Sequence, residues 1–325
     1  MAASLPAALS LPAAAAFAAG AFSSGLLLWA AMPLLRRRLL DQPTGRSSHQ
    51  RPTPRGGGVA FVLVAVVAAG LEALLRGVSA AVALPLLVLP LGLVGLLDDR
   101  WGLPTVWRYA VQLLTATVLV GLSPLEPPWP ALPLLWITVT AVINFTNFMD
   151  GLDGLVAGCL AVALAAAAVT AEGPWSLWAL VGALGGFLLW NWSPARVFMG
   201  DVGSTFLGAL FAGVVLQSSR WPDALGLLLV LAPLLLDAGT CVPRRLQAGQ
   251  PVLIAHRLHL YQRLHQAGWS HARVSALYIA ATATLALAWG LGGVRAELIA
   301  VAGAVLWGWW LDQRVAVPFA VAARL

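Results

Sequence analysis

Long apolar stretches separated by short polar loops run along almost the whole chain. A helix needs about 20 mostly apolar residues to cross a bilayer, and eleven stretches of the sequence approach or reach that length. We therefore predict an all-α membrane protein with about eleven transmembrane helices. The predicted stretches cover residues 12–35, 57–75, 78–97, 107–123, 131–149, 155–172, 175–192, 202–219, 224–242, 274–293 and 296–312.

The composition agrees with this pattern. Hydrophobic residues make up 60% of the chain and charged residues only 10%, whereas ordinary soluble proteins have about 25% charged residues. No basic domain stands apart from the apolar stretches, so membrane loops and phosphate headgroups explain the net charge of +6 better than nucleic acid does. Cys159 and Cys241 are far apart and predict neither a disulfide framework nor a zinc site. No repeat or linker divides residues 1–325, which we interpret as a single domain.

The arginines predict how the chain is oriented. All 19 basic residues are arginine. If successive loops alternate between the two sides of the membrane, only Arg76, Arg220 and Arg295 lie on one side, and all the other arginines lie on the opposite side. Cytoplasmic loops carry the excess of basic residues, so we expect the N-terminus outside and the C-terminus in the cytoplasm. The same assignment places all five histidines and most aspartates on or near the cytoplasmic face. The candidate chemistry therefore lies on that face.

A polar cluster begins at Asn144, at the end of the fifth stretch. Asn144, Asn147, Asp150 and Asp153 follow one another at a constant step of three, which keeps them near one face of a helix end. They directly follow or end the uncharged run 131–149. Such groups are costly in lipid, so we expect them at the membrane edge or along a wet cavity.

Two other inner segments supply carboxylates. Asp98 and Asp99 end the third stretch, and adjacent carboxylates repel each other unless a cation or a proton separates them. This pair indicates either Mg²⁺ or a raised pKa, and a solvated helix end relieved by Arg100 and Arg108 is the alternative. Asp201 lies in a glycine-flanked turn at the start of the eighth stretch, where it can point into a cavity without steric hindrance.

Arg55 lies in the first inner loop, residues 41–58, which ends in three glycines at the start of the second stretch. Glycines let backbone N–H groups approach a phosphate closely, and a helix N-terminus adds a favourable dipole. The loop is therefore a candidate phosphate site. The alternative is a positively charged anchor followed by a flexible helix start.

His256, His259 and Arg263 lie in the long inner loop, residues 241–275. If residues 255–263 are helical, these three side chains share one face at steps of three and four. Three donors that include an arginine suit an anion such as a diphosphate better than a metal ion. An amphipathic helix on the membrane surface is the alternative.

Four of these segments, taken together, resemble the polyprenyl-phosphate N-acetylhexosamine-1-phosphate transferases. The segments occur in the family's order, the likeness covers nearly the whole chain, and the family has ten or eleven spans. They are Asp98-Asp99, Asn144–Leu155, Phe198–Ser204 and His256–Arg263. Together with His256–Arg263, the residues of Arg46–His49 and Pro52–Gly58 look closer to the branch that initiates O-antigen synthesis than to phospho-N-acetylmuramoyl-pentapeptide transferase. The latter has a lysine where Gly102 stands here and a run of histidines where His256 and His259 are spaced apart.

The resemblance implies a multi-pass enzyme of the bacterial cytoplasmic membrane with its active site on the cytoplasmic face. Undecaprenyl phosphate would attack the phosphorus that bears the sugar of a UDP-N-acetylhexosamine, and UMP would leave, as the first membrane step of cell-surface polysaccharide synthesis. The implied cofactor is Mg²⁺, with Mn²⁺ as an alternative, and family members are often homodimers. The resemblance leaves the sugar open.

The resemblance also implies a role for each candidate residue. Asp201 would be a direct Mg²⁺ ligand with Asp99 in support, and Asp98 would act on the lipid phosphate as a base or as an orienting group. The implied substrate-binding residues are Asn147, Asp150 and Asp153 for the nucleotide, Asn144 for the shape of the turn, His256, His259 and Arg263 for the sugar diphosphate, and Arg55.

An ion- or proton-coupled transporter, or a lipid flippase, is the main alternative function. Membrane-embedded Asp and Asn residues also coordinate ions or protons in such proteins. A transporter would place ionisable groups near the middle of its spans and would usually contain an inverted repeat. The predicted spans contain few such groups and no repeat is evident, so an enzyme explains the pattern better.

Overall fold

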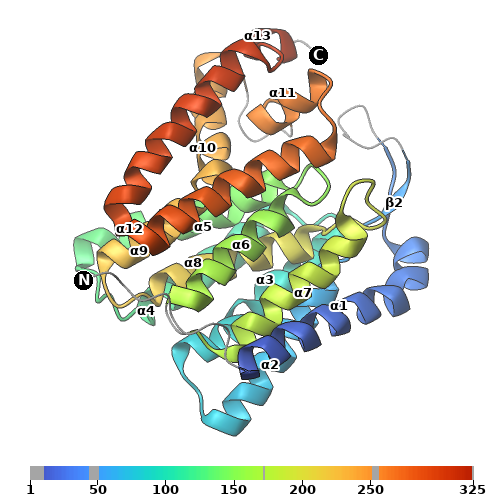
Figure 1. Cartoon of the computed structure of the whole chain (residues 1–325). Helices are drawn as coiled ribbons and strands as arrows, with labels where there is room; N and C mark the ends of the chain where they lie inside the picture. Colours follow the sequence, from blue (N-terminus) through green and yellow to red (C-terminus); the bar gives the residue numbers. More distant parts are fainter. Residues whose placement is uncertain (1–10, 44–50, 171–172, 251–255, 324–325) are drawn as a thin grey trace.

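The computed structural model describes residues 11–43, 51–170, 173–250 and 256–323. These residues form a helical bundle with one short pair of strands (Figure 1). The elements are α1 Leu11–Arg38, β1 Leu40–Asp41, β2 Thr53–Pro54, α2 Val59–Arg76, α3 Ala80–Trp101, α4 Thr105–Gly121, the 3₁₀ helix Trp129–Ala131, α5 Leu132–Met149, α6 Leu155–Thr170, α7 Trp175–Asn191, α8 Asp201–Leu216, α9 Trp221–Val230, α10 Ala232–Gln247, α11 Leu260–Gln266, α12 His271–Arg314 and α13 Phe319–Ala322.

The predicted helical fold is confirmed, since every predicted apolar stretch falls mostly on helix in the described residues. Among the described residues, five helices are long and apolar enough to cross a membrane, or up to six if α9 and α10, which meet at a bend of 79°, form one span. Helices α6, α7 and α8 are apolar but shorter. The number of eleven crossings and the orientation of the termini stay predictions.

Helix α12 contains both of the last two predicted stretches. Gly293 separates them with φ 65° and ψ −169°, a backbone conformation that glycine adopts without steric cost. The chain therefore turns sharply there, and Figure 1 shows the two arms of α12 running in different directions from this corner.

The pair of strands is a feature that the all-α prediction omitted. Strands β1 and β2 pair antiparallel, with Leu40 opposite Pro54. Pro54 of β2 and Gly57 just after it form hydrogen bonds with the loop before α8. The N–H of Phe198 donates to the Pro54 carbonyl at 2.8 Å, and the N–H of Gly57 donates to the Phe198 carbonyl at 2.9 Å. These bonds hold the first inner loop against the start of α8.

Helix α8 lies at the centre of the bundle, and all of its residues except Asp201 and Val214 are buried. The contact between α3 and α8 depends on Gly95, because a Cβ atom at that position would lie 2.4 Å from the carbonyl oxygen of Asp201. Glycine therefore lets α3 approach the N-terminus of α8 closely.

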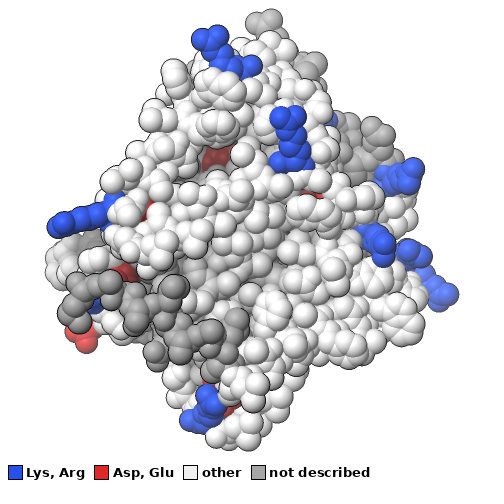
Figure 2. Space-filling model, in the orientation of Figure 1, with Lys and Arg blue, Asp and Glu red and all other residues white. Residues whose placement is uncertain are grey.

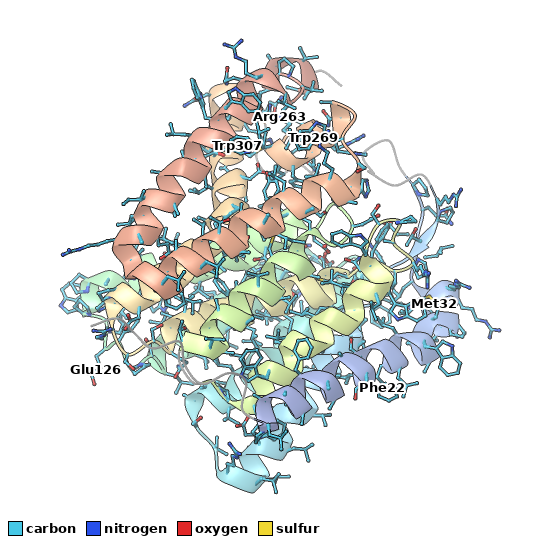
Figure 3. All side chains as sticks on the ribbon, in the orientation of Figure 1. Phe22, Met32, Glu126, Arg263, Trp269 and Trp307 are labelled. Carbon is cyan, nitrogen blue, oxygen red and sulfur yellow. The ribbon has the colours of Figure 1, made fainter. Side chains whose placement is uncertain are left out.

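The surface is largely apolar. Large side chains such as Leu74, Leu189 and Ile299 are exposed, and the face in Figure 2 is mostly uncharged, with arginines towards its edges. Exposed apolar area of this extent is typical of a surface that faces lipid. Figure 3 shows Met32 and Glu126 on opposite sides of the molecule, which follows from the alternating direction of the helices.

Candidate active site

The predicted site segments converge on one cavity of about 240 Å³. It lies where α3 and α5 end, α7 ends, and α8 and α12 begin. Its lining residues are Asp41, Arg55, Asp99, Asn147, Asp150, Gly151, Leu152, Asp153, Asn191, Phe198, Met199, Gly200, Asp201, Gln262 and His271. Six of the predicted site residues therefore line one cavity, although 146 positions of the sequence separate the first, Arg55, from the last, Asp201.

Asp99 and Asp201 come together because α3 ends where α8 begins. The carboxylate of Asp99 accepts the N–H of Val202 at 3.3 Å, and its side chain is only 2% exposed. Arg55 reaches the same place: it donates to the Asp99 carbonyl, and its Nε is 3.7 Å from the Asp99 carboxylate. The predicted pair of metal ligands thus faces a single hollow, and their role stays a prediction.

Asp98 lies beside the cavity rather than in its lining. One carboxylate oxygen accepts the N–H of Leu103 at 2.6 Å and the other accepts from Arg108 at 2.7 Å. Arg108 is also 3.5 Å from the Asp201 carboxylate. Arg108 therefore links Asp98 to Asp201, and the predicted action of Asp98 on a lipid phosphate would have to occur next to this guanidinium.

Asn147 and Asp150 lie at the end of α5 and line the cavity. The Asn147 side-chain oxygen accepts from the Ser204 hydroxyl at 3.0 Å, which fixes the amide against α8. Burial, with the negative charges of Asp201, Asp99 and Asp153 acting in the same direction, raises the pKa of Asp150 to about 8. The cavity therefore holds more carboxylates than it can keep ionised by itself.

The prediction that Asn144 shapes the turn is wrong. Residue 144 lies inside α5, which continues to Met149. Its amide donates to the side-chain oxygen of Gln112 at 2.8 Å and to the carbonyl of Thr140 at 2.8 Å. Because Gln112 belongs to α4 and is 4% exposed, this pair holds α4 against α5 and lies outside the cavity lining.

Asp153 lies in the turn between α5 and α6. Its carboxylate accepts the N–H of Ala195 at 3.1 Å and lies 3.2 Å from Nδ1 of His271. Burial acts to raise the pKa of Asp153, but the hydrogen bond and charge of His271 and the Ala195 amide outweigh it and lower the pKa. Asp153 is therefore held as an anion, unlike Asp150.

Sequence reasoning missed Asn191, Gln262 and His271 as lining residues. Asn191 ends α7, and its side-chain oxygen accepts the N–H of Gly154 at 2.9 Å. Gln262 accepts the N–H of His259 at 3.3 Å. The only signal in the sequence for His271 was its place among the histidines of the inner face, since nothing in its spacing connects it with Asp153.

The triple glycine does not present all its amides to a phosphate. The N–H groups of Gly57 and Gly58 donate to the carbonyls of Phe198 and Met199, each at 2.9 Å. A phosphate role for these two amides is therefore wrong, and the glycines instead permit close packing of α2 on the loop before α8. Arg55, just before them, does reach the cavity.

The condition that residues 255–263 are helical is not met for residues 256–259. Helix α11 begins at Leu260, with His259 as its N-cap. The carboxylate of Asp237 sets this start because it accepts the N–H groups of Leu260 at 2.7 Å and Tyr261 at 3.0 Å. His256 therefore lies before the helix and does not share a helical face with Arg263.

Arg263 is buried away from the cavity lining. Its side chain is 1% exposed, pairs with Asp312 of α12, and donates to the carbonyls of Leu258 at 3.1 Å and Val317 at 2.9 Å. Arg263 belongs to α11 and is labelled in Figure 3. Through these contacts, Arg263 holds α11 against the end of α12. They do not bring it to the predicted sugar-diphosphate site.

His256 and His259 lie together beside Cys241. The ligand atoms of the three residues lie within 4.8 Å of one another. The sequence prediction compared only the two cysteines with each other, and it did not place Cys241 beside two histidines. Burial, followed by the neighbouring His259 and the charge of Arg245, lowers the pKa of His256 to about 3. Burial also lowers the pKa of His259, against the opposing effect of Asp237. Nearby guanidinium groups, Arg263 included, disfavour a cation at this place. Neither histidine lines the cavity that contains Asp99.

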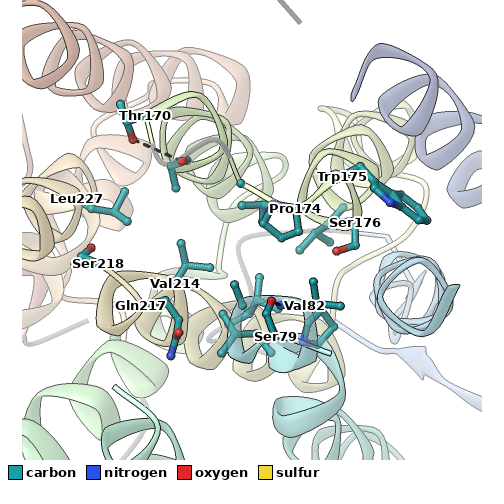
Figure 4. A pocket seen from close by; sticks show the side chains of 18 of the residues that line it. Ser79, Val82, Thr170, Pro174, Trp175, Ser176, Val214, Gln217, Ser218 and Leu227 are labelled. Carbon is teal, nitrogen blue, oxygen red and sulfur yellow. Dashed lines mark hydrogen bonds between the residues drawn. The ribbon is translucent and has the colours of Figure 1, made fainter. Parts of the chain in front are cut away.

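A second cavity, of about 670 Å³, lies at the other ends of the same helices (Figure 4). It is lined near the start of α3 by Ser79 and Val82, near the start of α7 by Trp175, and near the end of α8 by Gln217. Its Glu72 carboxylate accepts the backbone N–H groups of Trp175 and Ser176. That carboxylate thus caps α7. Among the described residues, the other carboxylate of this lining is Asp223, which pairs with Arg220.

The donor set around the first cavity fits a magnesium ion. Asp99, Asp150 and Asp201 supply carboxylate oxygens, and the charges of Asp99 and Asp201 raise the pKa of Asp150. Oxygen ligands suit Mg²⁺, which keeps several waters, and no cysteine lines this cavity in the described part of the chain. Asp99 and Asp201 are the residues that would hold such an ion.

Comparisons with known proteins agree with this site. The model of glycosyl transferase family 4 matches residues 81–219. The chain is 33% identical over 296 residues to decaprenyl-phosphate N-acetylglucosaminephosphotransferase of Mycolicibacterium smegmatis, which covers 75% of this chain and 73% of the relative. It is 31% identical over 271 residues to the probable undecaprenyl-phosphate N-acetylglucosaminyl 1-phosphate transferase of Bacillus subtilis, covering 74% and 73%. It is 30% identical over 330 residues to phospho-N-acetylmuramoyl-pentapeptide-transferase of a Synechococcus species, covering 90% and 91%.

The apolar helices and the carboxylate cavity at their ends define a membrane-embedded protein with a polar site. The chain belongs to glycosyl transferase family 4, together with these polyprenyl-phosphate transferases. The matched segment, residues 81–219, contains all the predicted aspartate site residues and excludes the loop with His256 and His259. The family prediction made from the four motifs is therefore confirmed.

Proposed function

We propose that this protein transfers an N-acetylhexosamine-1-phosphate from a UDP-sugar to a polyprenyl phosphate and releases UMP. The observation that carries the proposal is the convergence of Asp99, Asp150 and Asp201 on one cavity at the ends of apolar helices. The names of the relatives support it, since they contain a polyprenyl phosphate and an N-acetylated sugar phosphate. The finer choices are undecaprenyl phosphate as the acceptor and the cytoplasmic face of the bacterial inner membrane as the location.

The reaction brings two anions together, and the cavity has the groups to manage that charge. An oxygen of the lipid phosphate forms a bond with the phosphorus that bears the sugar, while the bond from that phosphorus to the UMP oxygen breaks. Bound Mg²⁺ would neutralise charge on the diphosphate, held by Asp99 and Asp201. Arg55 and Arg108 lie 3.7 Å and 3.5 Å from these two carboxylates and can bind the remaining phosphate oxygens.

Asp98 and Arg108 act together at the lipid phosphate in this proposal. The phosphate is largely ionised at cytoplasmic pH because its second pKa is about 6, so little proton removal is needed. Arg108, fixed by its 2.7 Å bond to Asp98, orients the attacking oxygen. Orientation of this kind lowers the barrier without a proton transfer.

The nucleotide occupies the part of the cavity formed by Asn147, Asp150 and Asp153. Carboxylate and amide oxygens there accept hydrogen bonds from the uracil N–H or the ribose hydroxyls. The three residues surround the turn between α5 and α6, which Asn191 holds through Gly154. His256 and His259 stay predicted contacts for the sugar diphosphate.

The sugar and the pathway are the finest parts of the proposal. The relatives' names contain N-acetylglucosamine in two cases and N-acetylmuramoyl-pentapeptide in the third, so UDP-N-acetylglucosamine is the first substrate to test. The prediction of an O-antigen role rests on Pro52–Gly58, on His256–Arg263 and on Arg46–His49, which lies outside the described residues. A cell-wall polymer is the other product class. A homodimer also stays a prediction.

The proposal is tested with purified protein, undecaprenyl phosphate, Mg²⁺ and a panel of UDP-N-acetylhexosamines. We expect UMP release that requires both the lipid and the metal ion and that falls about 100-fold or more in Asp201→Asn. Asp223→Asn is the matched control, because Asp223 pairs with Arg220 on the surface and should leave the rate unchanged. No UMP release from a folded protein with any sugar of the panel would contradict the proposal.

A further inference from the structure

We propose that His271 binds an anionic oxygen of the nucleotide diphosphate, with its imidazole oriented by Asp153. The inference rests on the proposed function and adds a substrate-binding residue that neither the sequence motifs nor the matched family segment includes. It concerns the side of the cavity formed by α12, opposite the arginine-bearing first inner loop.

The position of His271 supports a contact with substrate. It is the first residue of α12, after the N-cap Ser270, whose hydroxyl accepts the N–H of Arg273 at 3.2 Å. The side chain is 12% exposed and lines the same cavity as Asp99 and Asp201. An anion near His271 would also be stabilised by the dipole of a long helix N-terminus.

The pairing with Asp153 determines which ring nitrogen is available. Nδ1 of His271 lies 3.2 Å from the Asp153 carboxylate. An imidazole whose Nδ1 faces a carboxylate presents Nε2 on the far side of the ring. His265 packs edge-on against the ring with centroids 4.5 Å apart, which restricts its rotation. The Nε2 atom is thus the group left to bind a ligand.

The charge balance of the cavity gives the reason for a second positive group. Among the lining residues in the described part of the chain, Arg55 and His271 are the two that can carry a positive charge. A nucleotide diphosphate brings several negative charges into a space already lined by carboxylates. His271, which faces the Asp153 carboxylate at 3.2 Å, therefore complements Arg55 in this lining.

A purely structural role makes a different prediction, and Ser275 provides the control. The Ser275 hydroxyl, one turn further along α12, donates to the backbone carbonyl of Asp153 at 2.7 Å. It anchors the same turn to the same helix but offers no charge to the cavity. If His271 only held the turn, removal of either anchor would have a similar effect.

The test compares binding of UDP and of uridine by isothermal titration calorimetry to wild type, His271→Ala and Ser275→Ala. We expect His271→Ala to weaken UDP binding about tenfold or more and to leave uridine binding unchanged, because uridine has no phosphate. Ser275→Ala should change both by less than about twofold. In turnover assays, His271→Ala should raise KM for the UDP-sugar and leave KM for the lipid phosphate unchanged.

The inference would be overturned if His271→Ala weakened UDP binding and uridine binding equally, or left UDP binding unchanged. It would also be overturned if Ser275→Ala weakened UDP binding as much as His271→Ala does. If His271→Ala does not fold, His271→Gln provides the same comparison, since its amide can donate to Asp153 but carries no charge. A wild-type protein that neither binds UDP nor releases UMP would instead contradict the proposed function.

Discussion

At the scale of single residues, the cavity is lined by more carboxylate side chains than positively charged ones. Asp150 shows this most clearly, because burial and then the charges of Asp201 and Asp99 raise its pKa to about 8. A carboxyl group in such a place destabilises the folded protein when its charge is not matched. Function explains its presence better than stability does.

Asp150→Asn should therefore stabilise the protein in Mg²⁺-free detergent solution. In the unfolded chain Asp150 ionises near pH 4, whereas in the folded protein it stays protonated up to about pH 8, so its destabilising effect grows as the pH rises between these values. We expect a Tm about 2–4 °C above wild type at pH 8 and a smaller gain at pH 5. Asp223→Asn, at an exposed ion pair, should give almost no gain. A lower Tm for Asp150→Asn at pH 8 would contradict this view.

The sequence was informative about Asp99 and Asp201 because ionised groups at the ends of apolar stretches must reach water or a polar cavity. It was uninformative about Arg263 and Asn144. The partner of Arg263 is Asp312, 49 residues away, and the partner of Asn144 is Gln112 on another helix. A polar residue near a motif can serve the site or the packing, and only the distant partner distinguishes the two.

At the scale of elements, the site depends on how closely α3 approaches the start of α8. A methyl group on residue 95 would lie 2.4 Å from the Asp201 carbonyl and 2.6 Å from the Val202 nitrogen. These are backbone atoms that cannot move away as a side-chain end could. Any separation of the two helices would displace Asp201 from Asp99.

Gly95→Ala should therefore reduce both turnover and stability. We expect a loss of about tenfold or more in the rate of UMP release and a lower Tm, because overpacking destabilises a tight contact. Gly70→Ala is the matched control: Gly70 lies inside α2 with no atom within 4 Å of an added Cβ, and its replacement should keep the rate and preserve or raise the Tm. Wild-type turnover in Gly95→Ala would show that the site tolerates helix separation.

The elements also show why some local predictions failed. Hydrophobic periodicity located the helices well, but it does not determine where a helix begins when a distant carboxylate sets its N-terminus. Asp237 does this for α11 through the N–H groups of Leu260 and Tyr261. The two short strands were missed because two residues per strand are too few to produce an alternating pattern.

At the scale of the whole molecule, the predicted helical class and the family are both supported, while the number of crossings is not settled by composition alone. The 79° bend between α9 and α10 and the corner of α12 at Gly293 change how stretches of helix relate to a bilayer. Alternating loops bring distant segments to one end of the bundle, which is why the motif segments meet there. Among the described residues, the cavity at the other end is lined by two carboxylates, Glu72, which caps α7, and Asp223, which pairs with Arg220.

The most direct test of the central claim follows the phosphorus atom. Purified protein is given undecaprenyl phosphate, Mg²⁺ and UDP-N-acetylglucosamine labelled with ³²P in the phosphate next to the sugar. Because the account requires attack on that phosphorus, the label should move into the lipid fraction together with the sugar, leaving unlabelled UMP. Label that remains in UDP while the sugar moves to the lipid would show glycosyl transfer instead and would contradict the account.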